Sequence, residues 1–173
     1  MSEHYISNAA LLEALLQYQK AVRRAKRLHQ ERPVLPDYIG ACFLKIADRL
    51  SRKPNFYSYT FREEMVMDAV ENCVLYVDNF DMKKSSNPFS YFTQIIYYAF
   101  LRRIQREKKQ LYLKYKLAEK LIVTQEFNKM ENKSSSNQGE LYTNIAEYID
   151  TFEKKVEAKK IKKRGLELFM EDE

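Results

Sequence analysis

The sequence predicts an all-α fold, and three observations lead to this prediction. Apolar residues recur with helical spacing, the segments that carry them are long, and glycine and proline are scarce at 3 and 4 of 173 residues. Hydrophobic residues make up 45% of the chain, which is enough for a packed core. We therefore expect a helical domain followed by a flexible linker and a C-terminal helix with a tail.

Two amphipathic helices are expected in the N-terminal part. Ser7 can cap the first helix, and Ile6 can pack on Leu11 as a hydrophobic staple. The second helix is expected at residues 37–50, since Pro54 prevents its continuation. The apolar faces are formed by Leu11, Leu15, Tyr18, Val22 and Ala25 in the first helix, and by Ile39, Phe43, Ile46, Ala47 and Leu50 in the second.

The third and fourth helices follow a short aromatic loop at residues 55–59. Thr60 and Glu63 have the spacing of a capping box, which predicts a helix from Thr60 to about residue 77. Asn87 can cap the fourth helix, with Pro88 at its first position. The pattern after Pro88 allows one long helix, or a helix broken once near residues 108–112.

The C-terminal part begins with a polar linker at residues 131–140. An amphipathic helix is expected at residues 141–160, with Leu141, Ile145, Tyr148, Phe152 and Val156 on one side. The expected organisation is N-terminal helices at 1–54, a central core at 55–130, the flexible linker at 131–140 and a basic helix with a tail at 141–173.

The formal net charge of +6 favours an acidic partner, first nucleic acid and second a membrane surface. The chain has neither an apolar run long enough to cross a membrane nor a signal peptide, so a cytoplasmic protein without a membrane partner is expected. Cys42 and Cys73 lack the companions of a metal site, and His4 and His29 lack a partner for catalysis. We expect a non-enzyme without metal or cofactor.

The third helix carries two different faces. The predicted core face is formed by Val66, Ala69, Val70, Cys73, Val74 and Val77. The other face combines acids with apolar residues, namely Glu64, Met67, Asp68, Glu71 and Leu75. On a basic protein such a face is either a docking site for a basic partner helix or a solvated surface.

The fourth helix is aromatic at its start and basic further along. One side carries Tyr91, Ile95, Tyr98, Arg102, Gln105, Arg106 and Lys109, and the core side carries Thr93, Ile96, Tyr97, Phe100 and Ile104. Aromatic rings can stack on unpaired bases, and basic side chains can neutralise phosphates. The alternative is a core helix whose basic side chains reach into solvent.

Two C-terminal features also have two interpretations. The basic run at residues 154–164 is either a DNA contact or a solubilising segment. The tail places large apolar residues ahead of three acids, and these residues are Leu166, Leu168, Phe169 and Met170. They form either a short motif that inserts into another protein or a segment that folds back on this chain.

The segments at residues 63–80 (EEMVMDAVENCVLYVDNF) and 87–104 (NPFSYFTQIIYYAFLRRI) resemble region 2 of bacterial sigma factors. The whole layout is similar to the late-gene sigma factors of T-even-type bacteriophages, including the loop at 55–60 and the apolar tail. Housekeeping sigma factors carry a tryptophan pair where this chain has Ile95 and Ile96. Aliphatic side chains can also insert between base steps.

The resemblance implies roles for individual residues. It places bacterial core RNA polymerase on Glu64, Met67 and Asp68, and the non-template strand of the −10 element in promoter DNA on Phe80 and Phe92. With the helix faces described above, the predicted polymerase-binding residues are Glu64, Met67, Asp68 and Glu71, and the predicted DNA-binding residues are Phe80, Phe92, Ile95, Tyr98, Arg102, Arg103, Arg106 and Lys109. Tyr98, Ala99, Arg102 and Arg103 match the duplex edge of the −10 element. It places the phage DNA sliding clamp on Leu166, Leu168, Phe169 and Met170.

The expected function is therefore that of a sigma factor for late transcription in an infected bacterial cell. The chain has no room for a −35-reading domain, so a −10-like, A/T-rich promoter element is expected, where DNA melting is easiest. A stand-alone helical repressor would use the same basic helix without the acidic face. An adaptor that joins polymerase to the clamp would use the acidic helix and the tail without DNA.

Overall fold

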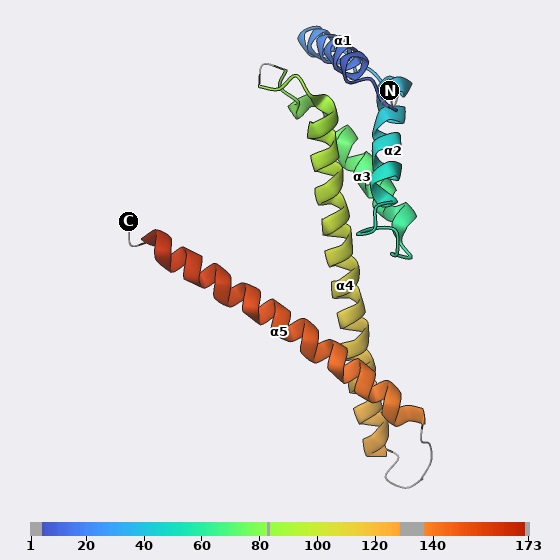
Figure 1. Cartoon of the computed structure of the whole chain (residues 1–173), viewed down its shortest axis with the longest axis vertical. Coiled ribbons are helices and arrows are strands. Elements are labelled where there is room, and N and C mark those ends of the chain that lie inside the picture. The colour runs from blue at the N-terminus through green and yellow to red at the C-terminus, as the bar shows by residue number, and fades with distance from the viewer. Residues whose placement is uncertain (1–4, 83, 129–136, 172–173) are drawn as a thin grey trace. The chain divides into compact units, whose positions relative to one another are not determined.

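The computed structural model confirms the all-α prediction, since the described residues contain helices and no strand (Figure 1). The backbone is described at residues 5–82, 84–128 and 137–171, and the side chains at 5–82, 84–121 and 143–161. The elements are α1 (Asn8–Arg27), α2 (Asp37–Ser51), α3 (Arg62–Leu75), the 3₁₀-helix η1 (Val77–Asn79), α4 (Pro88–Asn128) and α5 (Asn137–Glu171).

The chain divides into two units, and the division falls within α4. Unit 1 is Met1–Ile104 and contains α1, α2, α3 and the first part of α4. Unit 2 is Gln105–Glu173 and contains the rest of α4 together with α5. The N-terminal helices thus belong to the same unit as the segment that resembles sigma region 2.

The predicted helix starts at Ser7 and Asn87 are confirmed. The Ala10 amide donates to Ser7 Oγ over 3.4 Å, and the Ser90 amide donates to Asn87 Oδ1 over 3.1 Å. Each cap satisfies an amide that the first turn of a helix leaves without a backbone partner. Between the two possibilities for the fourth helix, the structure shows one unbroken helix as far as Asn128.

The predicted capping box at Thr60 and Glu63 is wrong. Helix α3 begins two residues later, at Arg62, without a side-chain cap, and it ends at Leu75 rather than near residue 77. The rings of Tyr59 and Phe61 lie 5.1 Å apart and pack against the core, while Thr60 is exposed in a turn. The two neighbouring rings are thus partly buried just ahead of the helix start at Arg62.

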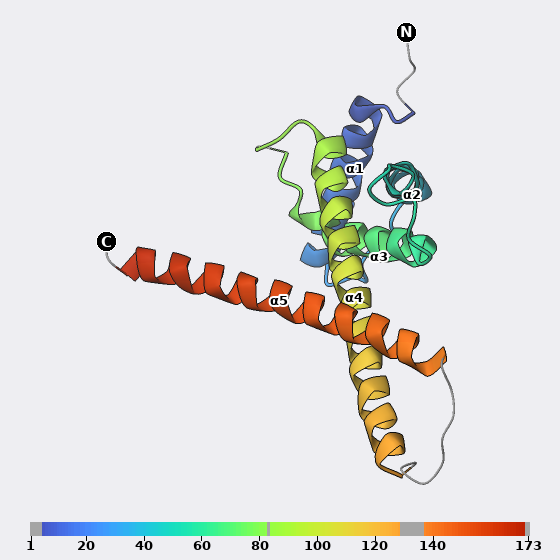
Figure 2. The same ribbon diagram turned by 60° about the horizontal axis from the view of Figure 1, so that its bottom comes forward.

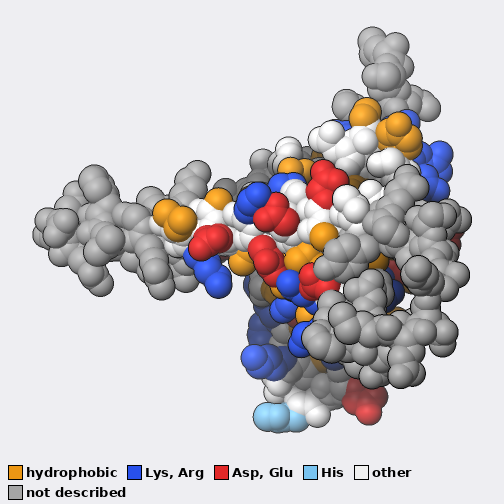
Figure 3. Space-filling view, turned by 90° about the horizontal axis from the view of Figure 1, so that it is seen from below, with side chains coloured by type: hydrophobic (Ala, Val, Ile, Leu, Met, Phe, Trp, Pro, Cys, Tyr) orange, Lys and Arg blue, Asp and Glu red, His pale blue; other side chains and the backbone are white. Residues whose placement is uncertain are grey.

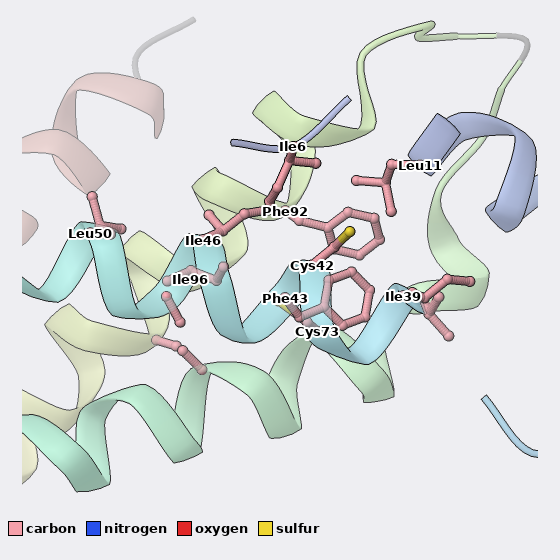
Figure 4. Close-up of a cluster of buried hydrophobic side chains, with 14 of the residues drawn as sticks. Ile6, Leu11, Ile39, Cys42, Phe43, Ile46, Leu50, Cys73, Phe92 and Ile96 are labelled. Atoms are coloured by element: carbon pink, nitrogen blue, oxygen red, sulfur yellow. The ribbon is translucent and has the colours of Figure 1, made fainter. Parts of the chain in front are cut away.

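The core of unit 1 joins all four of its helices. Figure 4 shows α2 side chains, including Phe43 and Ile46, packed against Phe92 and Ile96 of α4 and Cys73 of α3. The rings of Phe43 and Phe92 have centroids 4.4 Å apart, which joins α2 directly to α4. In Figure 2, α1, α2 and α3 lie around the first part of α4.

Two predicted core positions lie on the surface instead. Val74 of α3 and Tyr97 of α4 are exposed, whereas the other predicted core residues of these helices are buried or half-buried. Met65, which the pattern does not assign to the core, is fully buried. The helical pattern gives the right period for α3, but the buried face is rotated toward Met65.

Unit 2 is a helical hairpin held by aromatic contacts. The rings of Tyr112 and Phe152 stack with centroids 4.5 Å apart, and Tyr115 meets Tyr148 edge to face at 5.1 Å. Of the predicted linker at 131–140, residues 137–140 are helical and belong to α5, and the rest lies outside the described residues. Helix α5 also extends beyond the predicted end at residue 160.

We predict that stability falls at alkaline pH because of Cys73. Burial raises the pKa of its thiol from 9.0 to about 12. Between these values the unfolded chain loses a proton that the folded chain keeps, so rising pH favours unfolding. Urea denaturation at about pH 8 and about pH 10 should show this loss, and it should be smaller in Cys73→Ala. An equal loss in both proteins would contradict the prediction.

Candidate nucleic-acid and protein interfaces

The exposed side of α4 within unit 1 carries two tyrosines. The buried side consists of Phe92, Ile96, Ala99, Phe100 and Ile104. Tyr97 and Tyr98 remain 41% and 51% exposed. They meet edge to face with ring centroids 5.8 Å apart, and Tyr97 also meets Phe56 at 5.8 Å. These contacts orient Tyr97 while leaving part of both rings open to solvent.

A shallow groove of about 520 Å³ lies beside these rings. We call it the tyrosine groove, and its lining residues are Leu50, Lys53, Phe89, Ser90, Thr93, Gln94, Tyr97 and Tyr98. It combines aromatic faces with hydroxyl and amide groups and one cation. These are the groups that bind an unpaired base together with its phosphate.

Sequence reasoning included Tyr98 in its predicted DNA contacts but missed the rest of the tyrosine groove. Lys53 follows the end of α2, far from α4 in sequence, so no helical pattern could bring it to Tyr98. The helical pattern predicts Tyr97 as a core residue. In the structure Tyr97 is exposed, although one edge of its ring packs against Phe56. The aromatic pair at consecutive helix positions gave only a weak signal, because two neighbouring helical residues can both be buried, as Ala99 and Phe100 are.

Two residues that are predicted DNA contacts, Phe80 and Phe92, lie in the core of unit 1. Phe80 follows η1 and is buried, with its ring 5.2 Å from Tyr91 and 6.2 Å from Phe92. Phe92 is fully buried against Phe43. In this structure neither ring presents a face to a base, because both complete the packing between helices. Ile95 is half-buried and its neighbour Ile96 is buried.

Two of the predicted DNA-binding arginines contact α3. Arg102 donates from Nη2 to Asn72 Oδ1 over 2.7 Å and is otherwise exposed. Arg103 Nη1 lies 3.1 Å from Asp68 Oδ2, and the two side chains are only 18% and 28% exposed. The Arg103–Asp68 pair therefore joins α4 to α3 in a partly desolvated position.

The predicted polymerase-binding residues divide into an exposed set and one paired residue. Glu64, Met67 and Glu71 are exposed, and Met67 keeps 64% of its surface open. Leu75 is exposed on the same helix. We call these four residues the acidic face of α3. Asp68 is half-buried and engages Arg103, so it belongs to the packing between α3 and α4.

The remaining basic candidates lie in unit 2. Arg106 and Lys109 are exposed on α4, as are Lys154, Lys155, Lys159 and Lys160 on α5. Figure 3 shows that the described part of α5 exposes acidic and basic side chains together on the face in view. Lys154 forms an ion pair with Asp150 over 2.6 Å, so its positive charge is partly offset locally.

An ionic contact connects the two helices of unit 2. Glu153 accepts a hydrogen bond from the Tyr112 hydroxyl over 2.8 Å and lies 3.2 Å from Lys116 Nζ. These two partners lower the pKa of the Glu153 carboxyl, and the same contacts raise the pKa of Tyr112 and of Lys116. The predicted clamp-binding side chains Leu166, Leu168, Phe169 and Met170 lie outside the described side chains.

No protein-family model matches the chain, and no curated protein matches its sequence. In the part of the chain that the structure describes, no helix is both long and apolar enough to span a membrane. The same residues contain no group of three or more His, Cys, Asp or Glu side chains suited to a metal ion.

We predict that Asp68 and Arg103 are coupled in stability. Alanine substitution of each, and of both together, should give a coupling energy of about 1 kcal/mol in urea denaturation, because the pair is partly desolvated. The exposed pair of Asp48 and Arg52, 2.8 Å apart on α2, is the matched control and should give about half as much. A coupling energy near zero for Asp68 and Arg103 would show that α3 does not depend on this pair.

Proposed function

We propose that this protein is a sigma factor that recruits bacterial core RNA polymerase to −10-like late promoters and helps to open the DNA. One observation supports the proposal most strongly. A single helical unit exposes the acidic face of α3 for a basic protein partner and the tyrosine groove for an unpaired base. The sequence resemblance to sigma region 2 concerns these same two helices.

In this proposal the acidic face of α3 docks on the polymerase. Glu64 and Glu71 supply charge for a basic helix, and Met67 supplies an adaptable apolar contact. Asp68 acts indirectly by holding α3 against α4 through Arg103. The polymerase-binding set is thus proposed as Glu64, Met67, Glu71 and Leu75.

The tyrosine groove is proposed to hold the displaced strand of the −10-like element. Tyr97 and Tyr98 offer partly open rings for stacking, and Lys53 offers a cation for the adjoining phosphate. Ile95, Arg102, Arg106 and Lys109 are proposed to contact the neighbouring duplex. Phe80 and Phe92 are proposed to support the groove from within the core rather than to contact bases.

The apolar tail is proposed to bind the phage DNA sliding clamp through Leu166, Leu168, Phe169 and Met170. A short motif of this kind inserts apolar side chains into a pocket of its partner. In sequence, residues 105–165 separate this tail motif from unit 1. Clamp-dependent stimulation of transcription is the readout for this part of the proposal.

We predict that Tyr98→Ala weakens binding of a promoter-strand oligonucleotide to the complex with polymerase by about tenfold, because one stacked base contributes about 1–3 kcal/mol. Fluorescence anisotropy with a labelled single strand measures the change. Tyr57→Ala is the matched control, since Tyr57 is exposed and lies outside the tyrosine groove. Equal effects of the two substitutions would contradict a role for the groove.

We predict that specific run-off transcription by core polymerase requires this protein and fails with Glu64→Lys. The template carries an A/T-rich −10-like element without a −35 element. Charge reversal should reduce polymerase binding by about tenfold, because it places a cation against a basic partner. Glu13→Lys, at an exposed position on α1, is the control and should retain activity.

The same assay separates the competing functions. A stand-alone repressor would bind its DNA site equally well with Glu64→Lys and without polymerase. An adaptor without DNA recognition would tolerate alanine at Arg102 and Arg106. Absence of a specific transcript with the folded wild-type protein and its own polymerase would overturn the sigma-factor proposal.

A further inference from the structure

Unit 2 carries an exposed apolar stripe that the proposed function does not use. Leu113, Leu117 and Leu121 follow one another at intervals of four residues on α4, so they lie on one face of the helix. They remain 55%, 60% and 54% exposed. Single exposed leucines are ordinary on protein surfaces, but three successive ones on one face are not. We call these residues the leucine stripe.

The described contacts of α5, whose side chains are described at residues 143–161, lie away from the leucine stripe. The α5 side chains Tyr148, Phe152 and Glu153 contact α4 at Tyr115, Tyr112 and Lys116. At about 100° per residue, Tyr112 and Tyr115 lie on roughly the opposite side of the helix from the stripe, and Lys116 lies between the two faces. The hairpin is thus closed by one face of α4 and leaves a second apolar face for another contact.

The charge around the leucine stripe indicates its partner. Exposed cations border it, namely Arg106, Lys109, Lys114 and Lys120. The two acids of the same stretch, Glu107 and Glu119, are half-buried, and Glu119 lies 3.3 Å from Lys116. An apolar row between cations is complementary to a helix that has an apolar row between acids.

We propose that the leucine stripe binds an acidic amphipathic helix of another protein. Pairing with a second copy through this face would bring its cations against one another, which opposes self-association. A membrane is a weaker candidate for the occupant. Three leucine side chains carry about as many carbons as one acyl chain, and one acyl chain alone holds a protein on a membrane only marginally. The inference does not use the proposed polymerase contacts, and its test leaves Arg106 and Lys109, which are also proposed DNA contacts, unchanged.

The probe is a fluorescent synthetic helix with leucine at every fourth position and glutamate along both edges of that face. It should bind the full-length protein, and Leu117→Ser should weaken binding by about tenfold, since burying the open half of a leucine contributes about that much. Leu44→Ser is the matched control, because Leu44 is exposed to a similar extent on α2 in unit 1. Lys114→Glu should also weaken binding and does not involve the proposed DNA contacts.

Circular dichroism shows whether each variant keeps its helix content. A peptide of the same composition with its leucines spread around the helix should not bind, and equal binding of this peptide would overturn the proposal. A dimer of the wild-type protein that Leu117→Ser converts to a monomer would identify a second copy as the occupant. If the protein floats with anionic lipid vesicles but does not bind the acidic helix, the occupant is a membrane. Both the dimer result and the vesicle result would overturn the proposal.

Discussion

Burial of Phe92 is the constraint on which the arrangement of unit 1 depends. Its ring packs on Phe43 of α2, near Phe80 after η1, and beside Tyr91 of its own helix. Rotating α4 about its axis would withdraw this ring from Phe43 and Phe80 and open a cavity that costs about 3–5 kcal/mol. The packing of Phe92 therefore fixes the orientation of α4 about its axis in unit 1. That orientation sets the direction of the other α4 side chains in this segment.

The two candidate interfaces of unit 1 result from that rotation. With Phe92, Ile96 and Phe100 inside, Tyr98 has to face outward, and Arg103 points toward Asp68 on α3. The Asp68 carboxylate therefore pairs with Arg103 and is not part of the acidic face. The four residues of that face remain exposed, namely Glu64, Met67, Glu71 and Leu75. The packing of one ring thus leaves both the acidic face of α3 and the tyrosine groove exposed, and these are the two features on which the proposed sigma-factor function rests.

Helix α4 serves a different purpose in unit 2, where it has two apolar faces rather than one. The face of Tyr112 and Tyr115 closes the hairpin with α5. The leucine stripe remains open on the other side. The described helix contacts therefore leave one apolar face of α4 exposed to water. Burying this row of leucines against a partner would lower the free energy.

The sequence by itself determined the all-α class, the caps at Ser7 and Asn87, and the free cysteines of the core, because these depend on local spacing and on chemistry within one or two turns. It also separated the acidic face of α3 from most of its core face. Only the tertiary structure decided that Phe80 and Phe92 are buried, that Asp68 pairs with Arg103, and that Lys53 meets Tyr98 across a groove. A helical pattern limits which residues share a face, but the neighbouring helices determine which face is buried and which distant side chains meet.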